Sequence, residues 1–168
     1  MKRLTLVLLT TALLSACSPK YDWRDYHSGD APYSVLFPGK PASTTRPVQL
    51  GDLKVDMTMT ATEIDDVVFA VGSAKLTDPA QAPAALEAMQ TALVANISGT
   101  ISSSKSNTSG AQTVLDVDAK GAQNGASMRL IGRFISKNQR IYQVIVMGQE
   151  KHIVADTVDT YLSSFKLD

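Results

Sequence analysis

Residues 53–62 (LKVDMTMTAT) alternate between apolar and polar side chains without interruption. Successive side chains of a β-strand point to opposite faces of the sheet, so this period of two predicts a long strand with one buried and one solvated face. Gly51–Asp52, just before it, favours a two-residue hairpin loop and makes residues 47–50 the expected partner strand. Asp65–Asp66 predicts a second turn, into an antiparallel strand over residues 67–76.

A helix is expected after these strands. Asp78–Pro79 is a helix-start signal, and apolar residues then recur at helical spacing through residues 83–97. Gly99 is placed to end this helix. The end of the chain repeats the amphipathic pattern and predicts a C-terminal helix, whose apolar stripe consists of Ile153, Thr157, Val158, Tyr161, Leu162 and Phe165.

A second group of strands separates the two helices. Asn124–Gly125 is the strongest hairpin signal in the chain. The last two strands have nearly continuous apolar runs, which predicts that the sheet is covered on both faces, and Gly148 is expected to break the final one. The expected strands are residues 100–105 (a serine-rich edge strand), 111–120, 126–135 and 140–147.

The order of these groups is strands, helix, strands, helix. Strands joined by hairpins form antiparallel sheets, so we predict one α+β domain over residues 32–168: an antiparallel β-sheet with two main helices packed on it.

The N-terminus has the layout of an export signal. Lys2 and Arg3 precede an apolar core over residues 4–14, which is much shorter than the roughly 20 residues that cross a bilayer as a helix. Residues 14–17 (LSAC) resemble the lipobox of bacterial lipoproteins. That resemblance implies a signal peptide over residues 1–16, cut after Ala16, and a lipidated tether over residues 17–31.

In such lipoproteins the cysteine, here Cys17, carries a diacylglycerol thioether and an acylated amino group. Two alternatives are an ordinary signal cut after Ala16 and a buried cysteine of a cytosolic protein. Cys17 is the only cysteine, so no internal disulfide can use it. Ser18 follows it, which in similar lipoproteins favours sorting to the outer membrane.

Charge limits the classes of partner. The chain has 16 basic and 16 acidic residues, and losing Lys2 and Arg3 would leave the side chains at about −2. No basic stripe of the kind found in nucleic-acid-binding proteins is visible, so nucleic acid is not an expected partner. In the tether, Tyr21, Trp23 and Tyr26 either dock it onto the domain as an edge strand or form a patch for a protein partner.

Two short stretches resemble a known group of domains. Residues 33–41 (YSVLFPGKP) resemble the opening strand and turn of bacterial periplasmic domains of the DcrB and PsbP group, and residues 161–165 (YLSSF) resemble the end of their closing helix. The resemblance implies a PsbP-like α/β/α sandwich, in a group where many members are lipid-anchored without an assigned activity. It transfers no functional residues to this chain.

Catalytic chemistry has little support in the sequence. The motifs of serine hydrolases, zinc peptidases, dithiol enzymes and phosphate-binding loops are all missing. His27 and His152 have no obvious second ligand beside them. We therefore expect no catalytic residue, no metal site and no cofactor.

Charged residues on the strands give weaker signals. Asp116 and Asp118 share one strand face and could hold a hard cation, although a solvated face is the simpler interpretation. The acidic residues at 63, 65 and 66 are expected to solvate a hairpin tip. Arg129 and Arg133 also share a strand face, and they either pair with those aspartates or line an anion-binding cleft.

These observations favour a non-catalytic binding or accessory module of the bacterial envelope. Its partners would be the membrane, through the N-terminal lipid, and an envelope protein; it would face the periplasm from the outer membrane. The alternative is a carrier of a small ligand or ion, with a pocket between helix and sheet near Arg129 and Arg133. A hydrolase using His27 or His152 is a more remote alternative.

Overall fold

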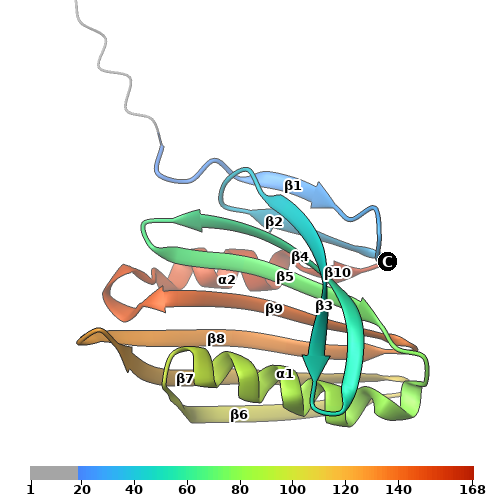
Figure 1. Cartoon of the computed structure of the whole chain (residues 1–168). Coiled ribbons are helices and arrows are strands. Elements are labelled where there is room, and N and C mark those ends of the chain that lie inside the picture. The colour runs from blue at the N-terminus through green and yellow to red at the C-terminus, as the bar shows by residue number, and fades with distance from the viewer. Residues whose placement is uncertain (1–18) are drawn as a thin grey trace, which may run out of the picture.

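The computed structural model describes residues 19–168, which form two antiparallel sheets, two α-helices and two short 3-10 helices (Figure 1). The predicted signal peptide (1–16) and the predicted lipidation site Cys17 lie outside the described residues. Within the described part, no helix is long and apolar enough to cross a membrane.

The larger sheet has seven strands in the order β3-β4-β5-β9-β8-β7-β6, and every neighbouring pair is antiparallel. The two predicted groups of strands are therefore joined at the centre, where β5 pairs with β9. The strands are β3 (Ala42–Leu50), β4 (Leu53–Ile64), β5 (Val67–Lys75), β6 (Thr100–Ser109), β7 (Gln112–Gln123), β8 (Ala126–Lys137) and β9 (Arg140–Gln149).

The hairpin turns are those that the sequence predicted. Gly51 has a φ of 59° in the two-residue loop between β3 and β4. Asp65 and Asp66 have φ values of 51° and 61°, and Asn124 and Gly125 have values of 50° and 78°. Positive φ at both central residues is the requirement of the hairpin turn whose twist matches that of the flanking strands.

A smaller sheet of three strands, in the order β1-β2-β10, packs on one face of the larger sheet. Its strands are β1 (Arg24–His27), β2 (Tyr33–Phe37) and β10 (Lys166–Leu167). The edge-strand interpretation of the aromatic tether is confirmed, because β1 pairs with β2 and both Trp23 and Tyr26 pack on the core. The strand β10 was not predicted.

Helices pack on both faces of the larger sheet, as expected, and the sheet separates two hydrophobic cores. Helix α1 (Ala82–Asn96) packs on one face, where Leu86 and Met89 meet side chains such as Leu130 and Ile145. Helix α2 (Ala155–Ser164) and the smaller sheet pack on the other face, where Tyr161 is fully buried. The predicted α+β class, with two main helices on an antiparallel sheet, is confirmed.

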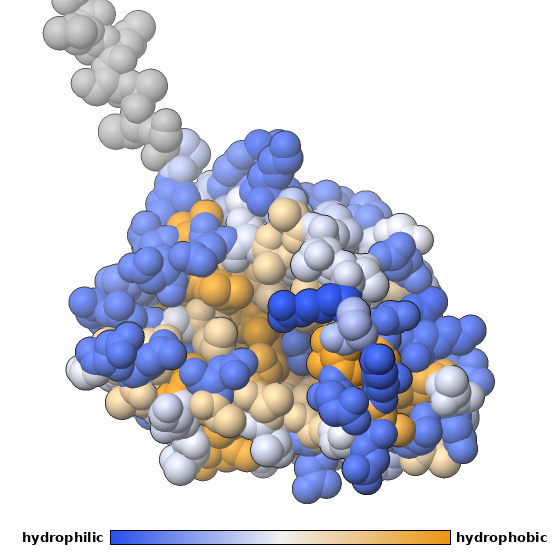
Figure 2. Space-filling model, in the orientation of Figure 1, coloured by the Kyte–Doolittle hydropathy of each residue, from blue (hydrophilic) through white to orange (hydrophobic). Residues whose placement is uncertain are grey.

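Residue alternation explains how one sheet serves two cores. In β4, Val55 and Met57 belong to the α1 core, whereas Thr60 on the opposite face forms hydrogen bonds with hydroxyl groups of the smaller sheet and of β3. Figure 2 shows the face that carries α1, where apolar residues gather in a hollowed centre surrounded by polar ones. The partly buried residues that pack on the α1 core include Met59, Ala61, Val68, Met128 and Met147.

The end of α1 differs from the prediction. The residue with positive φ is Ser98 (48°), not Gly99. The Gly99 N–H donates to the Val94 carbonyl oxygen and the Ser98 N–H to that of Ala95, which is the hydrogen-bond pattern of a Schellman cap. Gly99 is required for a different reason, since a Cβ there would lie 2.8 Å from the backbone oxygen of Lys120.

The prediction that Gly148 breaks the last strand is wrong. Gly148 lies inside β9, opposite Val67 on one side and Arg129 on the other. A Cβ at this position would lie 2.6 Å from the backbone oxygen of Asp66, so the glycine permits close approach of the β4–β5 turn. Two edge strands are also longer than predicted, because β3 begins at Ala42 and β6 continues to Ser109.

The C-terminal helix is shorter than predicted. It ends at Ser164, and Phe165 has extended backbone angles. The Phe165 ring stacks on Tyr33 with ring centroids 5.5 Å apart, which turns the last residues onto β2 to form β10. The start of α1 follows the predicted signal, because Asp78 caps the short 3-10 helix Pro79–Gln81 that leads into it.

Candidate functional site

On the α2 side of the larger sheet, strands β6, β7 and β8 carry charged side chains beside a few apolar ones. Helix α2 packs against β2 and β9, so β8, β7 and β6 extend beyond it. The register aligns Arg133 of β8 with Asp116 of β7, and Asp116 with Lys105 of β6. Residues that are directly opposite on neighbouring strands share a face, so these three side chains form one row across the open half of the sheet.

Two arginine–aspartate pairs occupy this surface. Arg129 donates from Nε to Asp118 Oδ1 (3.1 Å) and from Nη2 to Asp118 Oδ2 (2.6 Å), a two-pronged contact. Arg133 donates from Nε to Asp116 Oδ1 over 2.7 Å and from Nη2 to Asp116 Oδ2 over a longer 3.5 Å. The pairing that the sequence favoured is therefore confirmed, and the Asp118 carboxylate raises the pKa of Arg129 above its ordinary value.

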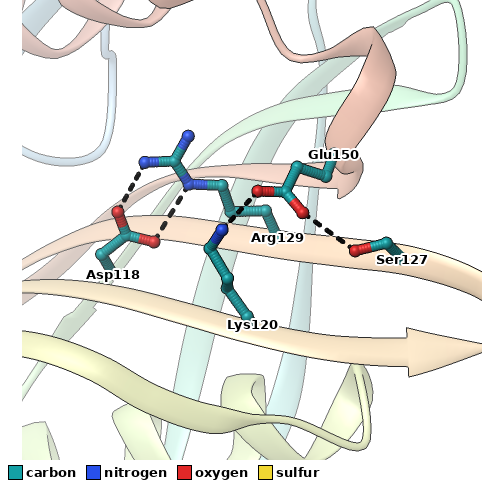
Figure 3. Close-up of polar contacts among 5 residues, drawn as sticks. All are labelled: Asp118, Lys120, Ser127, Arg129 and Glu150. Carbon is teal, nitrogen blue, oxygen red and sulfur yellow. Dashed lines mark hydrogen bonds and ion pairs between the residues drawn. The ribbon is translucent and has the colours of Figure 1, made fainter.

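A second polar cluster lies beside the first pair (Figure 3). Lys120 Nζ lies 2.5 Å from Glu150 Oε1, and Ser127 Oγ donates to Glu150 Oε2 over 2.9 Å. The Lys120 hydrogen bond lowers the pKa of Glu150 below its usual range. Sequence reasoning missed Glu150, because it lies 30 residues from Lys120 in the 3-10 helix Glu150–His152 and nothing in either segment points to the other.

A groove of about 550 Å³ lies at the other end of the open surface, between the sheet and the segment that follows α2. We call it the basic groove, because four cationic side chains and one carboxylate line it. These are Lys105, Arg133, Lys137 and Lys166, with Asp116 as the carboxylate. Val114, Ile135, Phe165 and Leu167 supply its apolar part, and Asn107 and Gln112 complete the lining.

The three lysines of the basic groove differ from its arginine in one respect. Arg133 is paired with Asp116, whereas Lys105, Lys137 and Lys166 have no carboxylate within 4.0 Å among residues 19–168. They come from β6, the end of β8 and β10, so no linear motif could have revealed them. Of the residues that the sequence singled out for a ligand, Arg133 lines the groove and Arg129 does not.

The two histidines lie apart from the basic groove. His27, in β1, is exposed and its Nε2 is 3.4 Å from Asp25. His152 lies in the 3-10 helix before α2, and its buried Nδ1 has no hydrogen-bond partner among the described residues. No group of three His, Cys, Asp or Glu side chains in residues 19–168 could hold a metal ion.

Comparison with known proteins finds a similar fold but no similar sequence. No protein-family model matches the chain, and no curated protein sequence matches it. The solution structure of cyanobacterial PsbP (CyanoP) from Synechocystis sp. PCC 6803 is similar, with a TM-score of 0.55 and 14% sequence identity over 94% of this chain and 99% of that one.

A crystal structure of a Pseudomonas aeruginosa protein of unknown function, described as a putative regulator, covers 77% of this chain and 84% of its own at 9% identity, with a TM-score of 0.37. The similarity to CyanoP confirms a PsbP-like fold for residues 19–168, which the sequence resemblance implied. At this identity the similarity concerns the fold alone.

Proposed function

We propose that this chain is a lipid-anchored, non-catalytic accessory domain of the bacterial envelope, held in the outer membrane and facing the periplasm. The export signal and the lipobox-like residues 14–17 support the anchor. One acyl chain binds a membrane only marginally, whereas a diacylglycerol thioether together with an acylated amino group holds a protein there durably.

The attachment of the first described residues to the folded domain is the observation that supports this proposal. Lys20 Nζ lies 2.8 Å from Asp65 Oδ2 in the β4–β5 turn, and the Asp22 N–H donates to the Pro38 carbonyl oxygen over 3.0 Å. Lys20 is three residues after Cys17, a span of at most about 11 Å in an extended chain. A lipid on Cys17 would therefore hold the domain directly beside a leaflet.

The lining of the basic groove supports binding over catalysis. It contains no histidine, cysteine, serine or threonine, and its three lysines have no carboxylate within 4.0 Å among residues 19–168 that could act as a base. Its one carboxylate, Asp116, is already engaged by Arg133. An accessory role, in which the domain holds a ligand or an envelope protein near the membrane, fits these residues.

Intact mass of the membrane-extracted protein tests the anchor. We expect a chain that lacks residues 1–16 and carries diacylglyceryl and acyl groups on Cys17. The Cys17→Ser variant should accumulate as an unmodified precursor, and a Ser18→Ala variant should be processed normally as the matched control. Wild-type protein that is recovered with its leader attached and a free thiol would overturn the proposal.

Sorting and partnership need a separate measurement. Separation of inner and outer membranes on a density gradient should place the protein with the outer membrane, and a Ser18→Asp variant should shift it to the inner one. Crosslinking in intact envelopes should return the same envelope protein reproducibly. Wild-type envelope behaviour on deletion, together with no reproducible partner, would contradict the accessory role.

A further inference from the structure

We propose that the basic groove is a binding site for a small organic anion that has an apolar body, such as an alkyl or aryl carboxylate or phosphate. The sequence raised an anion-binding cleft at Arg129 and Arg133, but no motif pointed to Lys105, Lys137 and Lys166 or to an apolar part of the ligand. The proposal rests on three properties of the described residues: the charge of the lining, its apolar part and its place in the molecule.

The charge of the groove is unlike that of the whole chain. The chain has a formal charge of zero, whereas the lining has four cations and one anion. Like charges that converge on one concave surface repel each other, and a bound anion relieves that repulsion. The three lysines without a carboxylate within 4.0 Å supply this attraction, because the Arg133–Asp116 pair is already neutral.

The apolar part of the groove favours a ligand that has an apolar body as well as a negative charge. Ile135 is buried at 3% exposure, and Phe165 is held against Tyr33 and Tyr142, with centroid separations of 5.5 and 6.0 Å. The wall is thus backed by a packed aromatic cluster and is largely preformed. A volume of about 550 Å³ lies in the range of sites that take small ligands, and the side-chain amides of Asn107 and Gln112 can orient one.

Such an anion could be a free molecule of the periplasm or a lipid of the leaflet that holds the anchor. The register pairs Val67 with Gly148 and Gly148 with Arg129, so the anchored turn at Asp65 lies near the Arg129 end of β8. Lys137 is eight residues further along the strand, about 27 Å away. The groove therefore opens at the end remote from the anchor, which assigns the ligand to the solution; this choice of source rests on the proposed anchoring at Cys17.

Binding can be measured on the mature protein reconstituted in phosphatidylcholine vesicles. The probes are octanoate, octanol, acetate and inorganic phosphate, read by the thermal midpoint of unfolding and by hydrogen exchange of residues 105–116 and 133–137. We expect octanoate to raise the midpoint and to protect these segments. The other three probes should have little effect, because each lacks either the charge or the apolar body.

Variants assign the effect to the lysines. Lys137→Gln with Lys166→Gln should weaken octanoate binding at least about tenfold, and 1 M salt should also weaken it. Both side chains lie at the surface of the groove, so the variant should fold and lose mutual repulsion. Lys54→Gln, an exposed lysine on β4 outside the groove, is the matched control and should bind like the wild type.

Each alternative outcome overturns a defined part of the proposal. An equal effect of octanoate and octanol would mean an apolar patch without anion recognition, and an equal effect of acetate or phosphate would mean a site for any anion. No effect of any probe, or binding that Lys137→Gln with Lys166→Gln leaves unchanged, would overturn the site itself.

The source of the ligand has its own test. Protection of residues 133–137 by phosphatidylglycerol vesicles without octanoate would show that the ligand is a lipid of the membrane and would overturn its assignment to the solution. Vesicle flotation measures the attachment of the protein to the membrane separately. A failure of ligand binding at the groove can therefore be distinguished from a failure of the proposed lipid anchor.

Discussion

Asp118 and Arg129 face each other diagonally across β7 and β8 and share two hydrogen bonds, of 3.1 and 2.6 Å. Their side chains are only 26% and 32% exposed, whereas those of Asp116 and Arg133 are 46% and 33% exposed. Partial burial weakens solvent screening, and the second hydrogen bond of the Asp116–Arg133 pair is long, at 3.5 Å. The two pairs look alike in sequence but should differ in their contribution to stability.

We therefore expect unequal coupling energies. Double-mutant cycles with Asp118→Ala and Arg129→Ala should give a coupling of about 1 kcal/mol, and the same cycle on Asp116 and Arg133 should give about 0.3 kcal/mol. Urea unfolding of the single and double variants measures both values. Equal coupling in the two cycles would contradict the role assigned to burial and geometry.

Gly121 should be intolerant of a side chain. A Cβ at this position would lie 2.1 Å from the carbonyl oxygen of Ile97, at the end of α1. The backbone of Gly121 is fixed by the sheet and that of Ile97 by the helix cap, so neither can move away easily. Gly121→Ala should therefore destabilise the protein by about 3 kcal/mol. Chemical denaturation measures the loss.

The matched control is Gly29→Ala. A Cβ at Gly29 has nothing within 4 Å, so this substitution should be neutral or slightly stabilising. A stability loss at Gly121 no larger than that at Gly29 would show that α1 can move away from β7.

The hydroxyl of Tyr161 should be dispensable. Its oxygen has no hydrogen-bond partner among residues 19–168, while its ring packs on Phe37 and Phe69 with centroids 5.6 and 5.3 Å away. Tyr161→Phe keeps the packing and removes an unpaired buried polar group, so it should stabilise the fold by about 1 kcal/mol. Tyr161→Ala, which removes the ring, should cost about 4 kcal/mol. A destabilising Tyr161→Phe would reveal a partner for the hydroxyl.

The same tyrosine should shape the response to alkaline pH. Burial raises the pKa of Tyr161 well above its ordinary value of 10.0. The folded state then holds its proton at a pH where the unfolded state releases it, so the stability is complete below pH 10 and falls as the pH rises above 10. Tyr161→Phe should make this decline shallower in unfolding experiments from pH 9 to 11. An unchanged slope would contradict the assignment.

Glu150 should make the stability of the fold depend on pH under acidic conditions. Its hydrogen bonds from Lys120 and Ser127 lower its pKa below the ordinary 4.5. A lowered pKa in the folded state means that the contribution is present above pH 4.5 and is lost as the pH falls below that value. In Glu150→Gln, the thermal midpoint should therefore fall less steeply as the pH decreases below 4.5. The control is Glu63→Gln, because Glu63 is exposed and has no ion pair in residues 19–168. Equal slopes for the two variants would contradict this role.

Several features could be predicted because they depend on neighbours in the chain. The alternation in residues 53–62 is visible locally, and the turns at Asp65–Asp66 and Asn124–Gly125 need only the residues that form them. The pairing of the arginines with Asp116 and Asp118 was within reach for a similar reason, since Asn124–Gly125 sets the register of β7 against β8.

The errors share a physical cause. Gly99 and Gly148 looked like ordinary breakers, but each is required because another segment approaches its backbone, and the sequence does not show which segment that is. Phe165 continued the apolar stripe of α2 yet leaves the helix, because stacking on Tyr33 stabilises an extended chain end.

The sequence by itself determined the strands, the hairpins, the two helices and the α+β class, because alternation, helical spacing and turn chemistry act over a few residues. Only the tertiary structure decided that β5 pairs with β9, that β10 closes the smaller sheet, and that Lys105, Lys137 and Lys166 converge on one groove. These three outcomes depend on contacts between residues far apart in the chain, which are set by how two cores pack on a single sheet and not by any local pattern.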